Sequence, residues 1–353
     1  MKIHQRHLAV DQPDTPPALV ASKRLSRVQI FSALSVFALL IALRLPGAWI
    51  EGRFQDEEAT VFLAFAWNFP WVEALFRSFA GYWNLAANGL TLLVASAVQG
   101  GLLSLEHAPY ATMILSLLSQ LMPAWLILTG EARWLNGVRP RLVMLLVMAL
   151  APTSEEVLLN VMHVQFHLAL SVALIVALDV PRGRTARGIS VILLLLAPLC
   201  GPGAIMFLPL LLLRALIERE HGRLVQLVAL GLGAAVQMSV FYGASPVRET
   251  GLPPVNLLDE TMLRIIAGTS LRLLVLPFAG IPVALHLGFV APEQPLLALA
   301  LGLLPPIGFG LLGWSAWKRR DGSAWLLAGS ILVMVVTLGV GLATMNPRAA
   351  YFA

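Results

Sequence analysis

The sequence predicts an all-α fold, a polytopic bundle of transmembrane helices, and three observations support this prediction. The 353 residues are 58% hydrophobic and only 12% charged, with a mean hydropathy of +0.81. Apolar runs of about 20 residues recur along the chain, and a run of that length crosses a bilayer core as a helix. The runs are rich in Leu, Ala and Val, which favours helices over a membrane barrel.

The net charge of +5 comes from basic residues that cluster in short loops between the apolar runs. Such loops set the orientation of a helical membrane protein, because loops rich in Lys and Arg stay in the cytoplasm. Aromatic residues interleaved with basic ones on a soluble face are absent, so we exclude a nucleic-acid partner. The single cysteine, Cys200, excludes an internal disulfide and a multi-cysteine metal site.

The N-terminal part predicts a cytoplasmic tail followed by an anchor. Residues 1–27 are polar and basic, and an apolar run follows. No small-residue cleavage pattern precedes the next polar stretch, so we expect an uncleaved helix over roughly 28–47 with its N-terminus in the cytoplasm. Residues 28–353 then form one transmembrane helical domain.

The first extracytoplasmic loop is expected to span 48–84. Apolar residues recur within it at helical spacing: Val61, Phe62, Phe65 and Phe69. This spacing is typical of an amphipathic helix that lies on the membrane surface.

The rest of the chain predicts a series of shorter and longer membrane segments, about ten or eleven in all. They are expected at 85–104, 111–129, 142–151, 154–178, 189–200, 204–217, 224–243, 265–290, 295–314 and 324–345. Arginine-rich loops at 131–141 and 181–188 belong in the cytoplasm. Two full crossings before residue 131 would place that loop outside. Either 85–104 is therefore a short or re-entrant segment, or the positive-inside rule does not hold for this loop.

A polar stretch, TSEEVLLNVMHVQFHLAL (153–170), stands out in this apolar chain. On a helix with about 100° per residue, five residues share a stripe about 80° wide. They are Glu156, Asn160, His163, His167 and Ser171. Ionisable groups are costly in lipid, so the stripe is expected to face the protein interior or a water-filled cavity.

Four interpretations of this stripe remain open. It could hydrogen-bond to neighbouring helices, or form a proton relay in a transporter. The pair His163 and His167, four residues apart with Glu156 on the same face, could bind a divalent metal. It could also line a polar active-site cavity that opens outward. The cofactor is otherwise unknown, and the sequence requires none.

A second motif, FQDEEATVF (54–62), places three consecutive carboxylates just beyond the first helix: Asp56, Glu57 and Glu58. One interpretation is a helix N-terminus, where the dipole favours carboxylates. The other is a general base or a metal-binding carboxylate held at the membrane surface.

This layout resembles that of the GT-C glycosyltransferases, multi-spanning enzymes that use polyprenyl-phosphate sugars. In them an acidic motif lies in the first large extracytoplasmic loop, and QDEEATVFLAFAWN (55–68) stands at that place. The resemblance continues in GYWNLAANGLTLLVA (81–95), in LCGPGAIMFLPLLLLR (199–214) and in APTSEEVLLNVMHVQFHLAL (151–170). The last stretch fits the P-x-x-x-E-V-x-x-N-x-x-x-x-Q pattern of bacterial membrane proteins grouped with that superfamily. Many members also carry a soluble C-terminal domain, which we do not expect within these residues.

The resemblance implies an enzyme of the bacterial inner (plasma) membrane that transfers a sugar from a polyprenyl-phosphate donor to a glycan or lipid acceptor of the cell envelope. Its base would be Asp56, with Glu57 as the alternative. An arginine would bind the donor phosphate through its planar fork. The candidates are Arg53, Arg77, Arg248 and Arg348, and the stripe with Tyr82 and Asn84 would bind the sugar or head group.

Two other functions remain open on the sequence alone. A transporter or lipid-linked-sugar flippase is favoured by the stripe and by helix-breaking residues. These are Pro198, Gly201, Pro202, Gly203 and Pro209. A non-catalytic membrane subunit of an envelope-polymer assembly is the third hypothesis.

Overall fold

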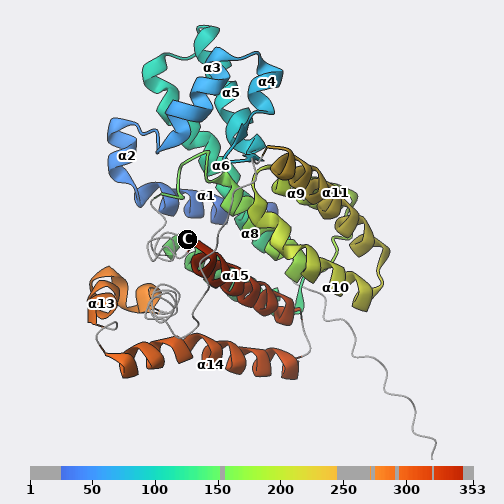
Figure 1. Ribbon diagram of the computed structural model, residues 1–353. Coiled ribbons are helices and arrows are strands. Elements are labelled where there is room, and N and C mark those ends of the chain that lie inside the picture. The colour runs from blue at the N-terminus through green and yellow to red at the C-terminus, as the bar shows by residue number, and fades with distance from the viewer. Residues whose placement is uncertain are drawn as a thin grey trace, which may run out of the picture.

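The computed structural model describes residues 25–151, 156–244, 271, 275–290, 294–319 and 322–344, and it confirms the all-α class (Figure 1). Within these ranges the only strands form one short hairpin, β1 (Ser78–Phe79) and β2 (Tyr82–Trp83). The proposed sites Arg248 and Arg348 lie outside the described residues.

Helices α6 (Ala108–Thr129) and α8 (Val164–Ala177) pack against each other at the centre of the structure (Figure 1). The helices that contact one or both of them include α1 (Arg27–Leu43), α7 (Val138–Leu150), α9 (Arg184–Leu199) and α15 (Ser323–Thr344). The largest cluster of buried apolar side chains is built mainly from these helices. This cluster is the core on which the loops and the other helices assemble.

The remaining long helices correspond to the expected segments. They are α10 (Leu208–Glu218), α11 (His221–Ala244), α13 (Leu276–Val290) and α14 (Pro295–Arg319), with a 3₁₀ turn η4 (Pro202–Phe207) before α10. Helices α9 and α11 lie side by side, and the Leu195 carbonyl leaves no room for a Cβ at Gly233 (Figure 1). Small residues at such positions let two helix backbones approach closely.

The first helix begins and ends for local reasons. Ser26 and Gln29 form a reciprocal capping box, in which each side chain accepts a hydrogen bond from the other's backbone N–H. The helix ends at Leu43, and a short helix α2 (Pro46–Glu51) follows because Pro46 lacks the N–H needed to continue the first one. The expected helix over 28–47 is therefore two helices.

The first loop folds into short elements rather than one surface helix. They are η1, a π-helical turn (Glu58–Leu63), then α3 (Ala64–Asn68), α4 (Trp71–Leu75), the β-hairpin and α5 (Leu85–Gln99). Together α3, α4 and α5 gather at one end of α6 (Figure 1). Helix α5 has 15 residues, about 22 Å, which is shorter than the bilayer core of about 30 Å.

The aromatic face expected to lie on the membrane is instead packed within the protein. Phe62 is only 1% exposed, and its ring meets that of Phe79 edge to face at 5.4 Å. Phe65 and Phe69 are half-buried, and the Arg77 guanidinium lies 3.8 Å from the centre of the Phe69 ring. The exposed large apolar side chains of this loop are a different set: Ile50, Trp67, Trp71, Val72 and Phe76.

The expected helix over 154–178 is wrong in its first half. Residues 156–163 form turns, Leu159 has a left-handed φ of 55°, and α8 begins only at Val164. The side chain of Asn160 is the physical reason, because its Oδ1 accepts the Met162 N–H at 2.8 Å. Asn side chains offer the backbone such local alternatives to helical hydrogen bonds.

Buried arginines satisfy the last carbonyls of the two central helices. Arg141 of α7, only 2% exposed, donates to the carbonyls of Leu128, Gly130 and Leu135 after the end of α6. Lone carbonyls at a buried helix end would otherwise be unsatisfied. A basic residue is also favoured there by the helix dipole.

The end of α8 is capped in the same way from two other helices. Arg214 of α10 donates to Val176 and Leu178, and Arg223 of α11 donates to Ile175 and Leu178. Both guanidinium groups also donate to Glu218, at 2.6 and 2.9 Å. The ends of α6 and α8 are thus tied to three surrounding helices.

Two stretches within the described ranges, Leu105–Thr129 and His221–Gly243, are long and apolar enough to cross a membrane, on length and composition alone. The first contains α6 and the second lies within α11. By themselves two such helices are weak evidence, because the buried core helix of a soluble protein passes the same test.

The capping contacts predict that Arg141→Gln destabilises the protein much more than Arg139→Gln on the same helix, where the side chain is exposed. Each buried carbonyl left unsatisfied costs about 1–3 kcal/mol. Thermal unfolding of the two variants in detergent, followed by tryptophan fluorescence, measures the difference. Equal unfolding temperatures for the two variants would contradict the capping role.

Candidate functional site

The turn over 156–163 gathers the predicted stripe, although not on a helical face. His163 Nδ1 lies 2.6 Å from the Glu156 carbonyl, and His167 Nε2 lies 3.4 Å from the Val157 carbonyl. Asn160 is fully buried and Glu156 is exposed. The histidines contact backbone carbonyls that a continuous helix would have used itself.

The acidic loop and this turn meet at one place. Arg53 Nη2 donates to the Leu158 carbonyl at 3.1 Å, and Glu58 Oε1 accepts the Val161 N–H at 3.4 Å. Two motifs about 100 residues apart therefore share backbone contacts.

Two more side chains reach the same turn from α5 and α6. Asn84 Nδ2 donates to the Met162 carbonyl at 2.9 Å, while its Oδ1 caps the start of α5 by accepting the Ala87 N–H. Ser116 Oγ donates to the Asn160 carbonyl at 2.9 Å. Asn84 was predicted as a binding residue, and the structure gives it these backbone contacts.

Glu58 is the buried carboxylate of the acidic motif. It is 0% exposed, and its Oε2 accepts the Gln55 N–H at 3.0 Å. Burial raises the pKa of this carboxyl above 4.5, and the bonds from Gln55, Thr112 and Val161 with the charge of Arg53 oppose that rise. A carboxyl with a raised pKa is a better proton acceptor near neutral pH, but no solvent reaches Glu58 in this conformation.

Asp56 and Glu57 differ from Glu58 in their exposure. Asp56 is exposed and Glu57 is half-buried. Asp56 has a left-handed φ of 46°, a conformation in which Asp is enriched but which still costs energy outside glycine. Its Oδ2 accepts a hydrogen bond from Gln55 Nε2 at 3.1 Å. Asp56 is therefore the most exposed carboxylate of this motif, and Glu57 is the next.

The other predicted binding residues of the first loop have structural contacts. Arg77 forms an ion pair with Glu73 at 3.1 Å besides its contact with the Phe69 ring. Tyr82 lies half-buried in the short hairpin. Arg53, which contacts the 156–163 turn, is the phosphate-binding candidate that lies with the acidic motif.

The predicted stripe does not assemble a metal site in the part of the chain that the structure describes. There, no three side chains of His, Cys, Asp or Glu come close enough to hold a metal ion. Of the stripe, only His167 and Ser171 lie in α8, and Ser171 donates to the His167 carbonyl at 2.8 Å.

Sequence reasoning missed the buried polar residues of α5 and α6 that support this site. Thr112 hydrogen-bonds to Glu58, and Gln120 Nε2 donates to Ser116 Oγ at 3.0 Å. Thr112, Ser116 and Gln120 are spaced four residues apart on one face of α6, and all are buried. This i, i+4 spacing was the available signal.

No family model matches the chain, and no curated protein or solved structure shows significant similarity to it.

The burial of Glu58 predicts a pH-dependent difference between the wild type and Glu58→Gln. Because its folded-state pKa is raised, the wild-type carboxyl favours the folded state most at low pH, and this contribution is lost as pH rises from 4.5 through the folded-state pKa. We expect the unfolding temperature of Glu58→Gln, relative to wild type, to rise over that range.

Glu57→Gln is the matched control, because it removes the neighbouring carboxylate of the same loop. Unfolding temperatures of the three proteins across a pH series measure the effect. A Glu58→Gln difference that stays constant with pH, or that follows the Glu57→Gln curve, would argue against a buried, raised carboxyl.

Proposed function

We propose that the chain is a multi-spanning membrane protein. The bundle exposes large apolar side chains on its outer helices, and this surface is unfavourable in water but suits lipid. On α1 alone these are Val28, Phe31, Val36, Leu39 and Leu43. The composition and the two candidate spans support the same proposal.

The two ends of the bundle differ in charge, which supports an orientation. The C-terminal ends of α6 and α8 lie beside the arginine-rich loops. The acidic loop lies at the opposite end of the bundle, beside the start of α8. By the positive-inside rule the arginine end is cytoplasmic and the acidic loop faces out.

This orientation predicts the labelling of single cysteines. Replacing the only cysteine in Cys200→Ala gives a background for Ser104→Cys, beyond α5, and Arg182→Cys, before α9. A membrane-impermeant maleimide should label Ser104→Cys on intact cells, but Arg182→Cys only after permeabilisation. The reverse pattern, or labelling of both on intact cells, would contradict the orientation.

We infer a sugar transfer from a polyprenyl-phosphate donor as the reaction that the site supports best. One observation carries the proposal: the acidic loop and the 156–163 turn are joined through Glu58–Val161 and Arg53–Leu158. The resemblance to GT-C enzymes expects an acidic first loop beside a polar, outward-facing wall, and these contacts put the two side by side.

The exposed carboxylate suits the role of the base. Asp56 accepts the proton of the acceptor hydroxyl as that oxygen bonds to the anomeric carbon of the sugar. The bond between the anomeric carbon and the phosphate oxygen breaks, and the polyprenyl phosphate leaves with the electron pair. Arg53, next to the motif, is placed to neutralise the phosphate. Glu58 acts as a positioning residue, because it fixes the loop against the 156–163 turn.

The transporter hypothesis has less support. It needs a polar stripe at mid-membrane, whereas Asn160 and His163 precede α8 and contact the backbone of a turn. The break at Gly201 separates α9 from η4, and η4 packs against α8 rather than opening a helix across a cavity. Sugar transfer therefore has more support than transport.

The proposal predicts that Asp56→Asn abolishes transfer while the protein still folds. Loss of a general base lowers the rate by roughly 10²–10⁴-fold. Membranes containing each variant are charged with radiolabelled nucleotide sugars, which load the polyprenyl-phosphate pool, and labelled acceptor is counted. Glu57→Gln tests the alternative base, and Glu51→Gln, an exposed acid at the end of α2, is the control.

Full transfer by both Asp56→Asn and Glu57→Gln would exclude the acidic motif from catalysis. A wild-type protein that transfers no sugar under these conditions would support a non-catalytic subunit instead.

A further inference from the structure

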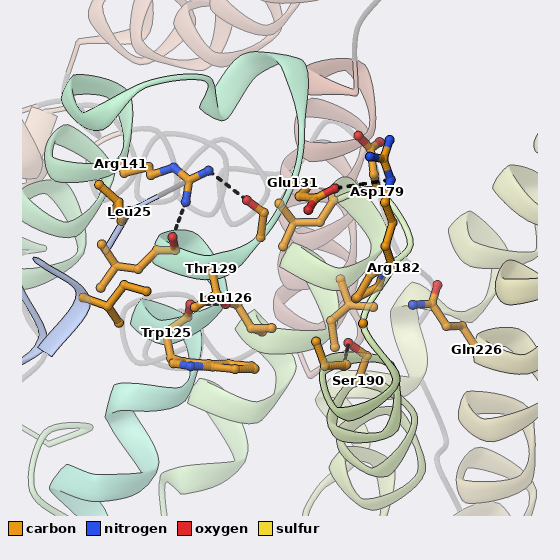
Figure 2. Close-up of a pocket in the computed structure, with 18 residues that line it drawn as sticks. Leu25, Trp125, Leu126, Thr129, Glu131, Arg141, Asp179, Arg182, Ser190 and Gln226 are labelled. Carbon is orange, nitrogen blue, oxygen red and sulfur yellow. Dashed lines mark hydrogen bonds and ion pairs between the residues drawn. The ribbon is translucent and has the colours of Figure 1, made fainter. Parts of the chain in front are cut away.

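A cavity of about 260 Å³ lies at the end of the bundle opposite the acidic loop, between the ends of α6 and α8 and the start of α9 (Figure 2). Its floor is apolar and includes Trp125, Leu126 and Ile175. Charged side chains from the connecting loops stand at its rim. None of the residues assigned to sugar transfer lines this cavity.

Charged groups of both signs surround this cavity, and Asp179 lies 3.5 Å from Arg214 of α10. Glu131 and Asp179 supply two carboxylates, while Arg141 and Arg182 supply two guanidinium groups. Arg141 is committed to backbone carbonyls, as Figure 2 shows, whereas Arg182 is largely exposed and lies 3.8 Å from Glu131. A purely anionic ligand would meet two carboxylates here, and a purely cationic one would meet Arg182.

A buried donor on the wall points to a ligand. Gln226 of α11 is 1% exposed, and its Oε1 accepts a hydrogen bond from Arg223 at 3.0 Å. That bond fixes which end of the amide is the NH₂ group, and within the described residues its Nε2 has no partner. Figure 2 shows this amide directed from α11 toward the cavity. A buried donor without an acceptor is costly, so an acceptor group is expected beside it.

An apolar groove adjoins the cavity. It has a volume of about 390 Å³ and lies between α1 and α7, where Val36, Leu40, Leu142 and Leu146 line it. Leu25 lines both the groove and the polar cavity, so the two spaces lie on either side of, or beside, that one side chain. A ligand with a polar head and apolar chains would fill both.

We propose that this cavity binds the headgroup of a membrane phospholipid that carries an ammonium and a phosphate, of the phosphatidylethanolamine class. The ammonium donates to the carboxylates of Glu131 and Asp179. The phosphate accepts from Arg182 and from the amide of Gln226, and an acyl chain lies in the α1–α7 groove. This inference rests on the membrane placement proposed above, but not on sugar transfer.

The test compares lipids that differ at one end of the headgroup. The purified full-length protein in detergent is titrated with phosphatidylethanolamine, phosphatidylcholine or phosphatidylglycerol of identical chains, and with soluble glycerophosphoethanolamine. Native mass spectrometry counts bound lipid, and thermal unfolding reports stabilisation. We expect phosphatidylethanolamine to bind about tenfold more tightly than the other two lipids, because only its ammonium donates N–H bonds to the carboxylates.

Two variants test the ammonium end and the phosphate end of the headgroup separately. Glu131→Gln with Asp179→Asn keeps the shape of the side chains and should abolish the preference for phosphatidylethanolamine over phosphatidylcholine. Gln226→Glu keeps an oxygen for Arg223 but faces the phosphate with a carboxylate, and should weaken binding of all three lipids. The matched control, Glu106→Gln with Glu51→Gln, removes two exposed carboxylates at the opposite end of the bundle and should leave binding unchanged.

Several results would overturn the proposal. These are equal binding of the three lipids by wild type, a preference that survives in the folded Glu131/Asp179 double variant, and soluble glycerophosphoethanolamine binding as tightly as the lipid. If the double variant does not fold, undiminished lipid binding by Gln226→Glu overturns it. Because every readout is binding or stability, these results do not depend on the Asp56 experiment.

Discussion

The capping of the last carbonyls of α6 and α8 by buried arginines is the interaction on which the arrangement of the helices depends. These carbonyls have no partner within their own helices, and an apolar surrounding offers them no water. Arg141, Arg214 and Arg223 reach them from α7, α10 and α11. These contacts fix the position of each of the three helices along α6 and α8, and they fix which face it turns toward that pair. Apolar packing alone does not specify either.

The opposite end of α8 is held by the same principle with different donors. There the side chains of Arg53, Asn84 and Ser116 donate hydrogen bonds to backbone carbonyls of the 156–163 turn. One backbone N–H of the turn donates to Glu58. From Val172 to Ala177 the side chains of α8 are all apolar, and five of these six residues are buried. The acidic loop is held by hydrogen bonds to the backbone of the 156–163 turn, and the same bonds satisfy polar groups of that turn. The conformations of the loop and of the turn therefore depend on each other.

The sequence predicted the helical class and most helices, because apolar runs and arginine-rich loops are local signals. It failed at 156–163, where period counting assumed a helix and the Asn160 side chain captured the Met162 N–H instead. The prediction that Phe62 faces the membrane surface also failed. Its ring packs against that of Phe79, in a hairpin that helical spacing does not reveal. That Glu58 accepts the Val161 N–H was not predicted, because no spacing rule links residues 103 positions apart.

These errors share a cause that also guides the functional argument. Polar residues in an apolar chain often mark places where the backbone leaves the helix or a helix ends, rather than a helical face that binds a ligand. Arg141 was predicted in a cytoplasmic loop because of its charge, yet it lies in α7 and its guanidinium donates to backbone carbonyls. Asn84 and Asn160 are likewise occupied by backbone groups. Two groups that the backbone does not occupy are the exposed carboxylate of Asp56 at one end and the Nε2 of Gln226 at the other. That is why the two proposed sites lie at opposite ends of the same pair of helices.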